Sequence, residues 1–418
     1  MVEAVEFMTL TPRERAQEIL ARSMEHARAG LRPVVEELPA RSSLGRVLAC
    51  DLLSPVDVPA FRRSTVDGFA VRARETFGAS AGSPAYFDLS REIRVGTCPG
   101  EPLGPGCAAP IATGAMLPED SDAVVMVENT QVLAGSIVAL ERPVAPSENV
   151  VGVGDDMRQG AVMLEAGREI RPQDIGLIAA VGDPEQVAVT VFARPRVGII
   201  SSGDELVAGS DVPGPGQVRD INSHSIAASV ERCGGVPVGF GLVRDTRDAL
   251  FAVLRQALDS CDAVILSGGS SVGGRDYTAD AIASLGEPGI LVHGVAIKPG
   301  KPTVLAIAGH KPAFGLPGHP VSALVAFELF VRPALELLAG LRNPRRRPTA
   351  RAVLAENIPS EPGREDYVFV RLDEAGVAHV VHGRSAMISM LAQADGWVVV
   401  RETDRGIEAG SDVEVVLI

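Results

Sequence analysis

The 418 residues are enough for several domains, and a hydrophobic content of 46% with a single Trp is typical of globular domains with aliphatic cores. No apolar run reaches 18 residues, which argues against a membrane-spanning helix, and the formal net charge of −14 argues against nucleic acid as a partner. Five scattered cysteines without a CxxC pair argue against a disulfide framework and favour a reducing, cytoplasmic compartment.

An amphipathic helix is predicted over residues 12–28. Thr11 as the N-cap, Pro12 at the first helical position and Glu14 together match a capping box. The residues expected to face inward are Ala16, Ile19 and Leu20.

The segment 58–71 places two arginines and an Asp-Gly turn between apolar residues. A surface turn is the simplest interpretation, but the doublet Arg62-Arg63 beside Asp67 makes Asp67 a candidate site residue. Residues 72–193 are rich in Gly and Pro, and short apolar runs such as 123–127 and 136–140 predict small antiparallel β domains. Within them, Asp156 lies on a glycine turn, a pattern that by itself is typical of a solvated loop.

From residue 194 the pattern changes to alternating strands and helices. Strands are predicted over 197–201, 236–243 and 263–266. A helix over 222–233 with Asn222 or Ser223 as its cap, and a second helix capped by Thr246, separate them. This βαβαβ alternation predicts a parallel sheet with helices on both faces, and such sheets bind ligands outside the carboxyl ends of their strands.

The third strand runs into a glycine-rich loop and then a helix predicted over 277–285, with Asp276 as its N-cap. A strand, a glycine turn and a helix N-terminus together present backbone N–H groups to an anion. Glycine allows the close approach, and Ser271 can donate to a phosphate oxygen. From this loop alone, an ordinary α/β crossover is an equally good interpretation. The predicted anion-binding residues are Gly268, Gly269, Ser271 and Gly273.

Three acids, Glu205, Asp245 and Asp276, each follow the carboxyl end of a predicted strand. Loops are polar, so a chance scatter of acids is one explanation. Three acids in consecutive loops, with Lys298 and Lys301 further along the chain, favour a site for a metal and a phosphate. Mg²⁺ takes few carboxylates and completes its shell with phosphate oxygens.

Residues 313–320 lead into a long helix with Pro320 near its first position. The turn that contains Pro317 and Gly318 is a second potential oxyanion pocket. His319 is expected to be a donor or a packing residue rather than a base. Beyond a solvated linker at 342–348, five short strands predict a small β-barrel, over residues 352–354, 367–372, 378–381, 397–401 and 413–418.

Six motifs, in order along nearly the whole chain, resemble those of the molybdopterin molybdenumtransferases, the MoeA-type enzymes that include the E domain of gephyrin. The motifs are residues 64–70 (STVDGFA), 154–156 (GDD), 203–206 (GDEL), 267–276 (SGGSSVGGRD), 296–302 (AIKPGKP) and 315–322 (GLPGHPVS). The sequence departs from the family in two places. His319 stands where the family usually has Asn, and Gly294 stands where some members carry Lys.

The resemblance implies a multidomain α/β and β fold. It has a three-layer α/β molybdopterin-binding domain with a parallel-rich sheet, two β-rich N-terminal domains and a C-terminal β-barrel. The implied division is residues 1–50 with 144–193 as domain I, 51–143 as domain II, 194–342 as domain III and 343–418 as domain IV.

The family's enzymes take adenylylated molybdopterin and molybdate, release AMP with Mg²⁺, and insert molybdenum into the dithiolene. By resemblance, Glu205, Asp245 and Asp276 match the acidic, metal-binding cluster. Asp67 and Asp156 match acids that reach the cleft from the second subunit of a homodimer. Lys298, Pro317 and Pro320 match cleft residues beside the substrate. Lys301 and Gly318 are expected to belong to the same site.

Two other functions fit the same fold. A molybdopterin adenylyltransferase shares the molybdopterin-binding domain, but its loop usually reads Thr-Gly-Gly-Thr-Gly and its chain is shorter. A non-catalytic scaffold would keep the fold for protein binding. A contact with the adenylyltransferase that supplies the substrate is a further expectation of the resemblance.

Overall fold

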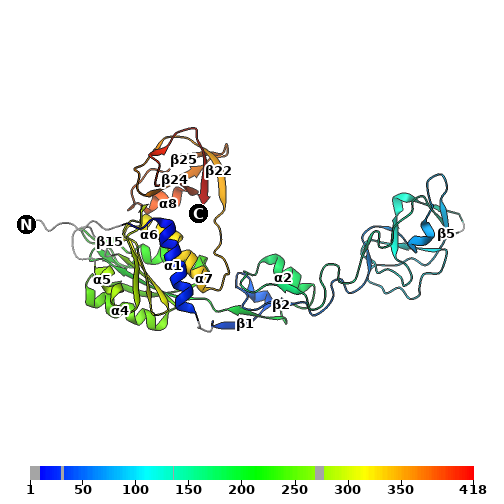
Figure 1. Cartoon of the computed structure of the whole chain (residues 1–418), viewed down its shortest axis with the longest axis horizontal. Coiled ribbons are helices and arrows are strands. Elements are labelled where there is room, and N and C mark those ends of the chain that lie inside the picture. Colours follow the sequence, from blue (N-terminus) through cyan, green and yellow to red (C-terminus); the bar gives the residue numbers. More distant parts are fainter. Residues whose placement is uncertain (1–9, 30–32, 135, 269–276) are drawn as a thin grey trace, which may run out of the picture.

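The computed structural model describes residues 10–29, 33–134, 136–268 and 277–418. The molecule is elongated, and its folded units follow one another along the long axis (Figure 1). An α/β unit and a β-barrel lie at one end, a small unit containing α2 lies in the middle, and a β-rich unit containing β5 lies at the other end. None of the helices in these described parts is long and apolar enough to cross a membrane.

The α/β unit is built on a six-stranded sheet with the order β16-β13-β17-β21-β20-β18. The first four strands are mutually parallel, whereas β20 runs antiparallel to both of its neighbours. The predicted parallel-rich sheet is therefore confirmed. The strands are β13 (Arg196–Ser202), β16 (Val236–Val243), β17 (Ala263–Gly268), β18 (Pro288–His293), β20 (Val304–Ala308) and β21 (Lys311–Leu316).

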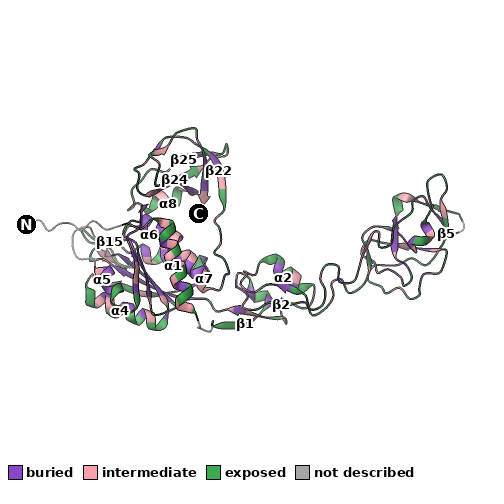
Figure 2. Cartoon of the chain, viewed as in Figure 1, coloured by how far each residue is buried: buried purple, intermediate pink, exposed green. Residues whose placement is uncertain are grey.

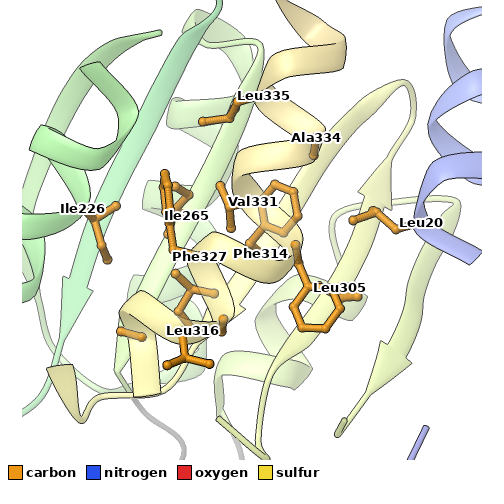
Figure 3. Close-up of a cluster of buried hydrophobic side chains, with 14 of the residues drawn as sticks. Leu20, Ile226, Ile265, Leu305, Phe314, Leu316, Phe327, Val331, Ala334 and Leu335 are labelled. Atoms are coloured by element: carbon orange, nitrogen blue, oxygen red, sulfur yellow. The ribbon is translucent and has the colours of Figure 1, made fainter. Parts of the chain in front are cut away.

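Helices cover both faces of this sheet, as predicted for three layers. Alternating residues of β17 show the division, because Ile265 packs into one core while Val264 and Leu266 pack into the other. The first core is closed by α1 (Arg13–Arg28), α3 (Asn222–Arg232) and a continuous helical run of α6 (Pro320–Ala326), a π-helical turn (Phe327–Val331) and α7 (Arg332–Leu338). Figure 3 shows this core, which includes Phe314, Phe327 and Leu335. The second is closed by α4 (Arg247–Ser260) and α5 (Tyr277–Ala283).

Helix α1 packs onto the α/β unit although it begins the described chain. Its residues Ala16, Leu20 and Met24, spaced by four, are buried in the first core. Full burial of a side chain such as Leu20 contributes about 1.5–3 kcal/mol. The four-residue spacing of these apolar side chains therefore gives α1 its docked position.

Two of the predicted helix caps are wrong. Thr11 does not cap α1, because its backbone bridges to Val295 as extended chain; Pro12 takes the N-cap position and there is no side-chain cap bond. Neither Asn222 nor Ser223 caps α3, since Ile221 is the N-cap residue and the Asn222 side chain is buried. The predicted cap position of Thr246 at α4 is confirmed, without a side-chain bond.

The middle unit is formed by two separate stretches of the chain. Strand β1 (Val35–Pro39) pairs with β12 (Ala188–Phe192), and β2 (Leu52–Leu53) pairs with β11 (Val162–Leu164). Helix α2 (Pro172–Ala179) and a 3₁₀ turn (Ala40–Ser43) complete it. All these elements share one small core that includes Leu48, Ile178 and Val191.

The β-rich unit at the far end is a six-stranded sheet with the order β7-β4-β6-β5-β9-β8. Its pairs are antiparallel, as expected, except for β5 with β6. The chain reaches it through a neck in which β3 (Arg63–Ser64) pairs with β10 (Val150–Val151). Its strands are β4 (Gly68–Val71), β5 (Ala85–Leu89), β6 (Cys107–Ile111), β7 (Ala123–Met126), β8 (Thr130–Leu133) and β9 (Ile137–Leu140), with 3₁₀ turns at Ala73–Thr76 and Val127–Asn129.

The predicted C-terminal barrel is confirmed. Five strands close on themselves in the order β24-β25-β22-β28-β26, with β26 pairing back to β24. Their buried positions form a separate aliphatic core, seen as purple segments in Figure 2. The strands are β22 (Thr349–Leu354), β24 (Glu365–Leu372), β25 (Val377–Val380), β26 (Gly396–Val400) and β28 (Asp412–Leu417), accompanied by the short pair β23 (Ile358–Pro359) and β27 (Gly406–Ile407) and by helix α8 (Ile388–Gln393).

Candidate active site

Most of the predicted site residues within the described parts gather at one edge of the α/β sheet. The parallel strands β13, β16 and β17 end there side by side, since Ser202 is level with Val243 and with Gly268. Glu205 follows β13 and Asp245 follows β16. The turn Pro317, Gly318 and Pro320 follows β21, which lies beside β17. Of the predicted residues, Gly269, Ser271, Gly273 and Asp276 lie outside the described residues.

The glycine at the end of β17 is dictated by a close approach of two strands. Gly268 has φ +123°, and a Cβ at this position would lie 1.8 Å from the carbonyl oxygen of Ser202. Only glycine fits such a position. The end of β17 is therefore pressed against the end of β13, which fixes where the glycine-rich loop leaves the sheet.

The two described acids differ in their surroundings. Asp245 is half-buried, and its Oδ1 accepts a hydrogen bond of 3.3 Å from the Ser202 hydroxyl. Glu205 is exposed on the loop between β13 and the short strand β14 (Leu206–Val207), which pairs with β15 (Val218–Arg219). Each acid is anchored at the end of a different, neighbouring strand.

Asn222, predicted as a possible helix cap, instead lies at the edge of the sheet that holds the predicted site. Its side-chain amide donates 2.8 Å hydrogen bonds to the Ser267 hydroxyl and to the Gly318 carbonyl. It therefore ties the end of β17 to the turn after β21. Because it begins α3 after a polar loop, its sequence context looks like that of a cap, and only the fold shows that it is buried.

The barrel unit also contacts the α/β unit near this edge of the sheet. Strand β19 (Ile297–Lys298) of the α/β unit pairs in parallel with β24 of the barrel. His319 Nδ1 lies 2.8 Å from the Ser385 hydroxyl, and Val321 N donates to the Ser385 carbonyl at 3.1 Å. Ser385 was not predicted, because it lies 66 residues from His319 along the chain and carries no local motif.

The two predicted lysines differ in their contacts. Lys298 places its Nζ 3.0 Å from Oδ2 of Asp366 in the barrel, while about half of its side chain remains exposed. Lys301 is exposed on the following turn. Both lysines therefore present charge to solvent next to the junction of the two units.

Asp67 and Asp156 do not join this edge within one chain. Asp67 precedes β4 in the β-rich unit, at the opposite end of the molecule (Figure 1). Asp156 is exposed and its N–H donates to the Val58 carbonyl at 3.0 Å, on the stretch that links the middle and β-rich units. Within a single chain both acids are thus separated from Glu205 and Asp245.

Asp67 is nevertheless held in a defined position. Its Oδ1 accepts hydrogen bonds from the Thr113 backbone N–H at 2.7 Å and from the Thr113 hydroxyl at 2.9 Å. These two bonds lower the pKa of the Asp67 carboxyl below its ordinary value. The exposed side chain is therefore a fixed carboxylate at neutral pH.

The described acids are compatible with magnesium. Carboxylate oxygens are the ligands that Mg²⁺ prefers, and it commonly uses one or two of them with waters and substrate phosphates. Glu205 and Asp245 supply two. In the described part of the chain no three His, Cys, Asp or Glu side chains group together as a ligand set, and the third predicted acid, Asp276, lies outside that part. The donor set thus suits a metal that shares its shell with a phosphate-bearing ligand.

Three family descriptions match consecutive stretches of the chain. They are the MoeA N-terminal region (domain I and II) over residues 11–182, a probable molybdopterin binding domain over 198–337, and the MoeA C-terminal region (domain IV) over 351–418. The molybdopterin molybdenumtransferase of Bacillus subtilis is 35% identical over 395 residues, which cover 92% of this chain and 90% of the relative.

The chain belongs to the molybdopterin molybdenumtransferase family. The enzyme of that name from Nostoc is 34% identical, over 89% of this chain and 86% of the relative. Among solved structures, a molybdopterin biosynthesis MoeA protein from Pyrococcus horikoshii aligns with a TM-score of 0.81 at 30% identity, covering 98% of this chain and 100% of the other. The similarity to the molybdenumtransferases therefore spans every unit of the fold, and the resemblance inferred from six motifs is confirmed.

Proposed function

We propose that this member of the molybdopterin molybdenumtransferase family is a transferase of molybdenum cofactor biosynthesis that inserts molybdenum from molybdate into adenylylated molybdopterin and releases AMP. The observation that carries the proposal is the convergence of Glu205, Asp245 and the end of β17 at one edge of the sheet, where the barrel pairs with the strand that carries Lys298. The named relatives support the same activity, because they match over nearly their full length.

The acids are assigned to magnesium. Glu205 and Asp245, with Asp276 as the third acid, would hold Mg²⁺, which when bound offsets the charge of the diphosphate as AMP leaves. Ser202 orients Asp245 through its hydroxyl. Three carboxylates beside an anionic substrate would otherwise repel it, because like charges at close range interact strongly in a partly dry cleft.

The oxyanions are assigned to donors and cations. Molybdate and phosphate oxygens need N–H groups or ammonium groups rather than carboxylates. Lys298, Lys301 and Ser271 are proposed for this role, with the backbone of the glycine-rich loop. The substrate would lie between that loop and the turn of Pro317, Gly318 and Pro320, whose position Asn222 fixes.

A homodimer with a shared site is part of the proposal. Asp67 and Asp156 lie far along the elongated chain from Glu205, so they reach a sheet edge only if it belongs to a second copy (Figure 1). We also propose a cytoplasmic location and a contact with the adenylyltransferase that supplies the substrate.

The direct test mixes purified protein with adenylylated molybdopterin, molybdate and Mg²⁺ and measures AMP by chromatography. Release of AMP that requires both molybdate and Mg²⁺ is the expected result. A parallel reaction with ATP and molybdopterin tests the alternative, since an adenylyltransferase would produce adenylylated molybdopterin there. Absence of turnover in both reactions would contradict the proposal, and a non-catalytic scaffold would be the remaining function.

A further inference from the structure

The α/β unit and the barrel are joined by backbone pairing. The parallel register aligns Ile297 with Glu365 and Lys298 with Asp366, and Glu365 N donates to the Ala296 carbonyl at 3.0 Å. In addition, Arg13 Nε of α1 donates to the Glu365 carboxylate at 2.7 Å. Strand β19 and helix α1 of the α/β unit therefore both contact the first residues of β24.

Asp366 is the buried acid at this junction. The residue is 3% exposed, and its Oδ2 accepts from Lys298 Nζ at 3.0 Å and from the Ser360 hydroxyl at 2.9 Å. Its Oδ1 is buried and has no hydrogen-bond partner among the described residues; Arg364 Nε lies 3.4 Å away, within ion-pair range but without hydrogen-bond geometry. Burying a carboxylate is strongly unfavourable unless its charge is well paired. The chain thus keeps an incompletely paired charge at this position.

Lys298 gains a defined position from this acid. A lysine side chain has a flexible four-carbon stem, so an exposed one samples many orientations. Here the Lys298 ammonium donates to the Asp366 carboxylate, which is itself held by burial and by the Ser360 hydroxyl. About half of the Lys298 side chain remains exposed to solvent. An ammonium group has three N–H donors, and the bond to Asp366 engages one. Among the described residues the other two have no hydrogen-bond partner, which leaves them for an anionic ligand.

We propose that Asp366 is a positioning residue that fixes the Lys298 ammonium for binding an oxyanion. This inference rests on the proposed function, which assigns Lys298 to oxyanions. Asp366 does not contact the anion, because a carboxylate would repel it. It acts by holding one N–H of Lys298 so that the ammonium is oriented before the anion arrives, which reduces the ordering cost of binding.

Two effects of Asp366 oppose each other, and this makes the proposal testable. Its negative charge partly offsets the charge of Lys298, which weakens anion binding, whereas its oxygen fixes the orientation, which strengthens it. Asp366→Asn removes the charge and keeps an oxygen acceptor. Asp366→Ala removes both. A positioning role therefore predicts that the alanine variant binds anion worse and that the asparagine variant recovers most of the loss.

The experiment measures molybdate binding to the full-length protein by equilibrium dialysis, and the molybdate dependence of AMP release. Asp366→Ala is expected to raise the half-saturating molybdate concentration roughly tenfold, the size of one charge-assisted hydrogen bond, with a smaller change in turnover at saturation. Asp366→Asn is expected within about threefold of the wild type by the same reasoning. Asp373→Ala, at an exposed turn of the same barrel where Asp373 pairs with His379, is the matched control and should leave binding unchanged.

A double-mutant cycle separates positioning from a structural role. In the Lys298→Ala background, Asp366→Ala should have no further effect on molybdate binding, since its target is gone. An equal loss in both backgrounds would overturn the proposal, as would an asparagine variant as poor as the alanine variant. Thermal unfolding checks that each variant folds. If Asp366→Ala does not fold, Ser360→Ala, which frees one side of the carboxylate, should still weaken binding about two- to threefold.

The two proposals fail in different ways. If the wild type releases no AMP and binds no molybdate, the proposed function is wrong. If the wild type responds to molybdate but the cycle is additive, the function stands and only the role of Asp366 is wrong.

Discussion

At the scale of single residues, the site divides into groups that suit a cation and groups that suit anions. Asp245, held by Ser202, belongs to the first kind, and Lys298 belongs to the second. Substituting one member of each kind should therefore change the dependence on different ions.

Asp245→Asn is expected to raise the Mg²⁺ concentration needed for half-maximal AMP release at least about tenfold, because a neutral amide is a weaker magnesium ligand. Its molybdate dependence should stay nearly unchanged. Lys298→Ala should instead raise the molybdate concentration needed for half-maximal AMP release and leave the Mg²⁺ dependence nearly unchanged. Paired titrations of each variant, with one ion varied and the other saturating, measure this. Rescue of Asp245→Asn by excess molybdate alone would reverse the assignment.

Thr113 is expected to control the ionisation of Asp67. Removing the hydroxyl bond in Thr113→Val should raise the pKa of Asp67 toward its ordinary value, since that bond stabilises the charged form. A carboxyl group whose pKa is lowered in the folded state stabilises the fold at pH values above its unfolded pKa. That stabilisation is lost as the pH falls through the folded pKa. The unfolded pKa does not change, so in Thr113→Val the loss of stability on acidification should be smaller than in the wild type and should be complete at a higher pH. Carboxyl NMR titration measures the shift, and Thr130→Val, which removes only a bond to the Val127 carbonyl, is the control.

His319→Asn should retain most activity. Asn can supply a donor or an acceptor to the Ser385 hydroxyl, which lies 2.8 Å from His319 Nδ1. The measurement is the turnover number at saturating substrates. A loss of several orders of magnitude would show that His319 takes part in the chemistry.

Much of the site could be predicted from the residues, and the rest depends on contacts across long stretches of chain. Glu205, Asp245 and Lys298 stand beside strand and turn patterns that are visible locally. Asp366 lies 68 residues from Lys298, in a different unit, with no motif of its own. Asn222 stands where a helix begins, so the local sequence does not indicate that its side chain is buried. Partners that come together only through the fold cannot be read from local spacing.

At the scale of elements, the sheet edge depends on glycine. Gly268→Ala should lower the free energy of unfolding by about 2–4 kcal/mol, because it combines a disfavoured backbone angle with an overlap between Cβ and the Ser202 carbonyl. Denaturant unfolding of the variant measures the loss. Gly239→Ala, in β16 of the same sheet, is the control, since a Cβ there meets nothing within 4 Å and its φ is not positive. Equal stability of the two variants would contradict the close approach of β13 and β17.

The elements themselves were predicted better than their ends. Apolar runs gave β13, β16, β17 and the five barrel strands, because burial on one or both faces leaves a clear pattern. The caps of α1 and α3 were wrong, since Thr11 is drawn into a bridge with Val295 and Asn222 into the site. Tertiary contacts overrode the local capping preference in both cases.

At the scale of the whole molecule, the elongated shape carries the prediction of a shared site. A heterodimer of an Asp67→Ala chain and a Glu205→Ala chain contains one site with both substitutions and one with neither. Because an isologous dimer repeats each contact twice, it should show about half the activity of a wild-type dimer. Differently tagged chains, purified together, allow the measurement. Confirmed heterodimers without activity would count against sharing.

The neck formed by β3 and β10 has a consequence for how the molecule could change over evolution. Between Ser64 and Val150, which are paired, the chain leaves the middle unit, builds the whole β-rich unit and returns to the same place. The β-rich unit is thus an insertion with its two ends side by side. Loop-closure entropy grows only slowly with length, by about 0.6 kcal/mol per doubling. The rest of the fold therefore hardly depends on the size of the insertion, so loops of that unit away from Asp67 could lengthen or shorten with little effect on the folding of the other units.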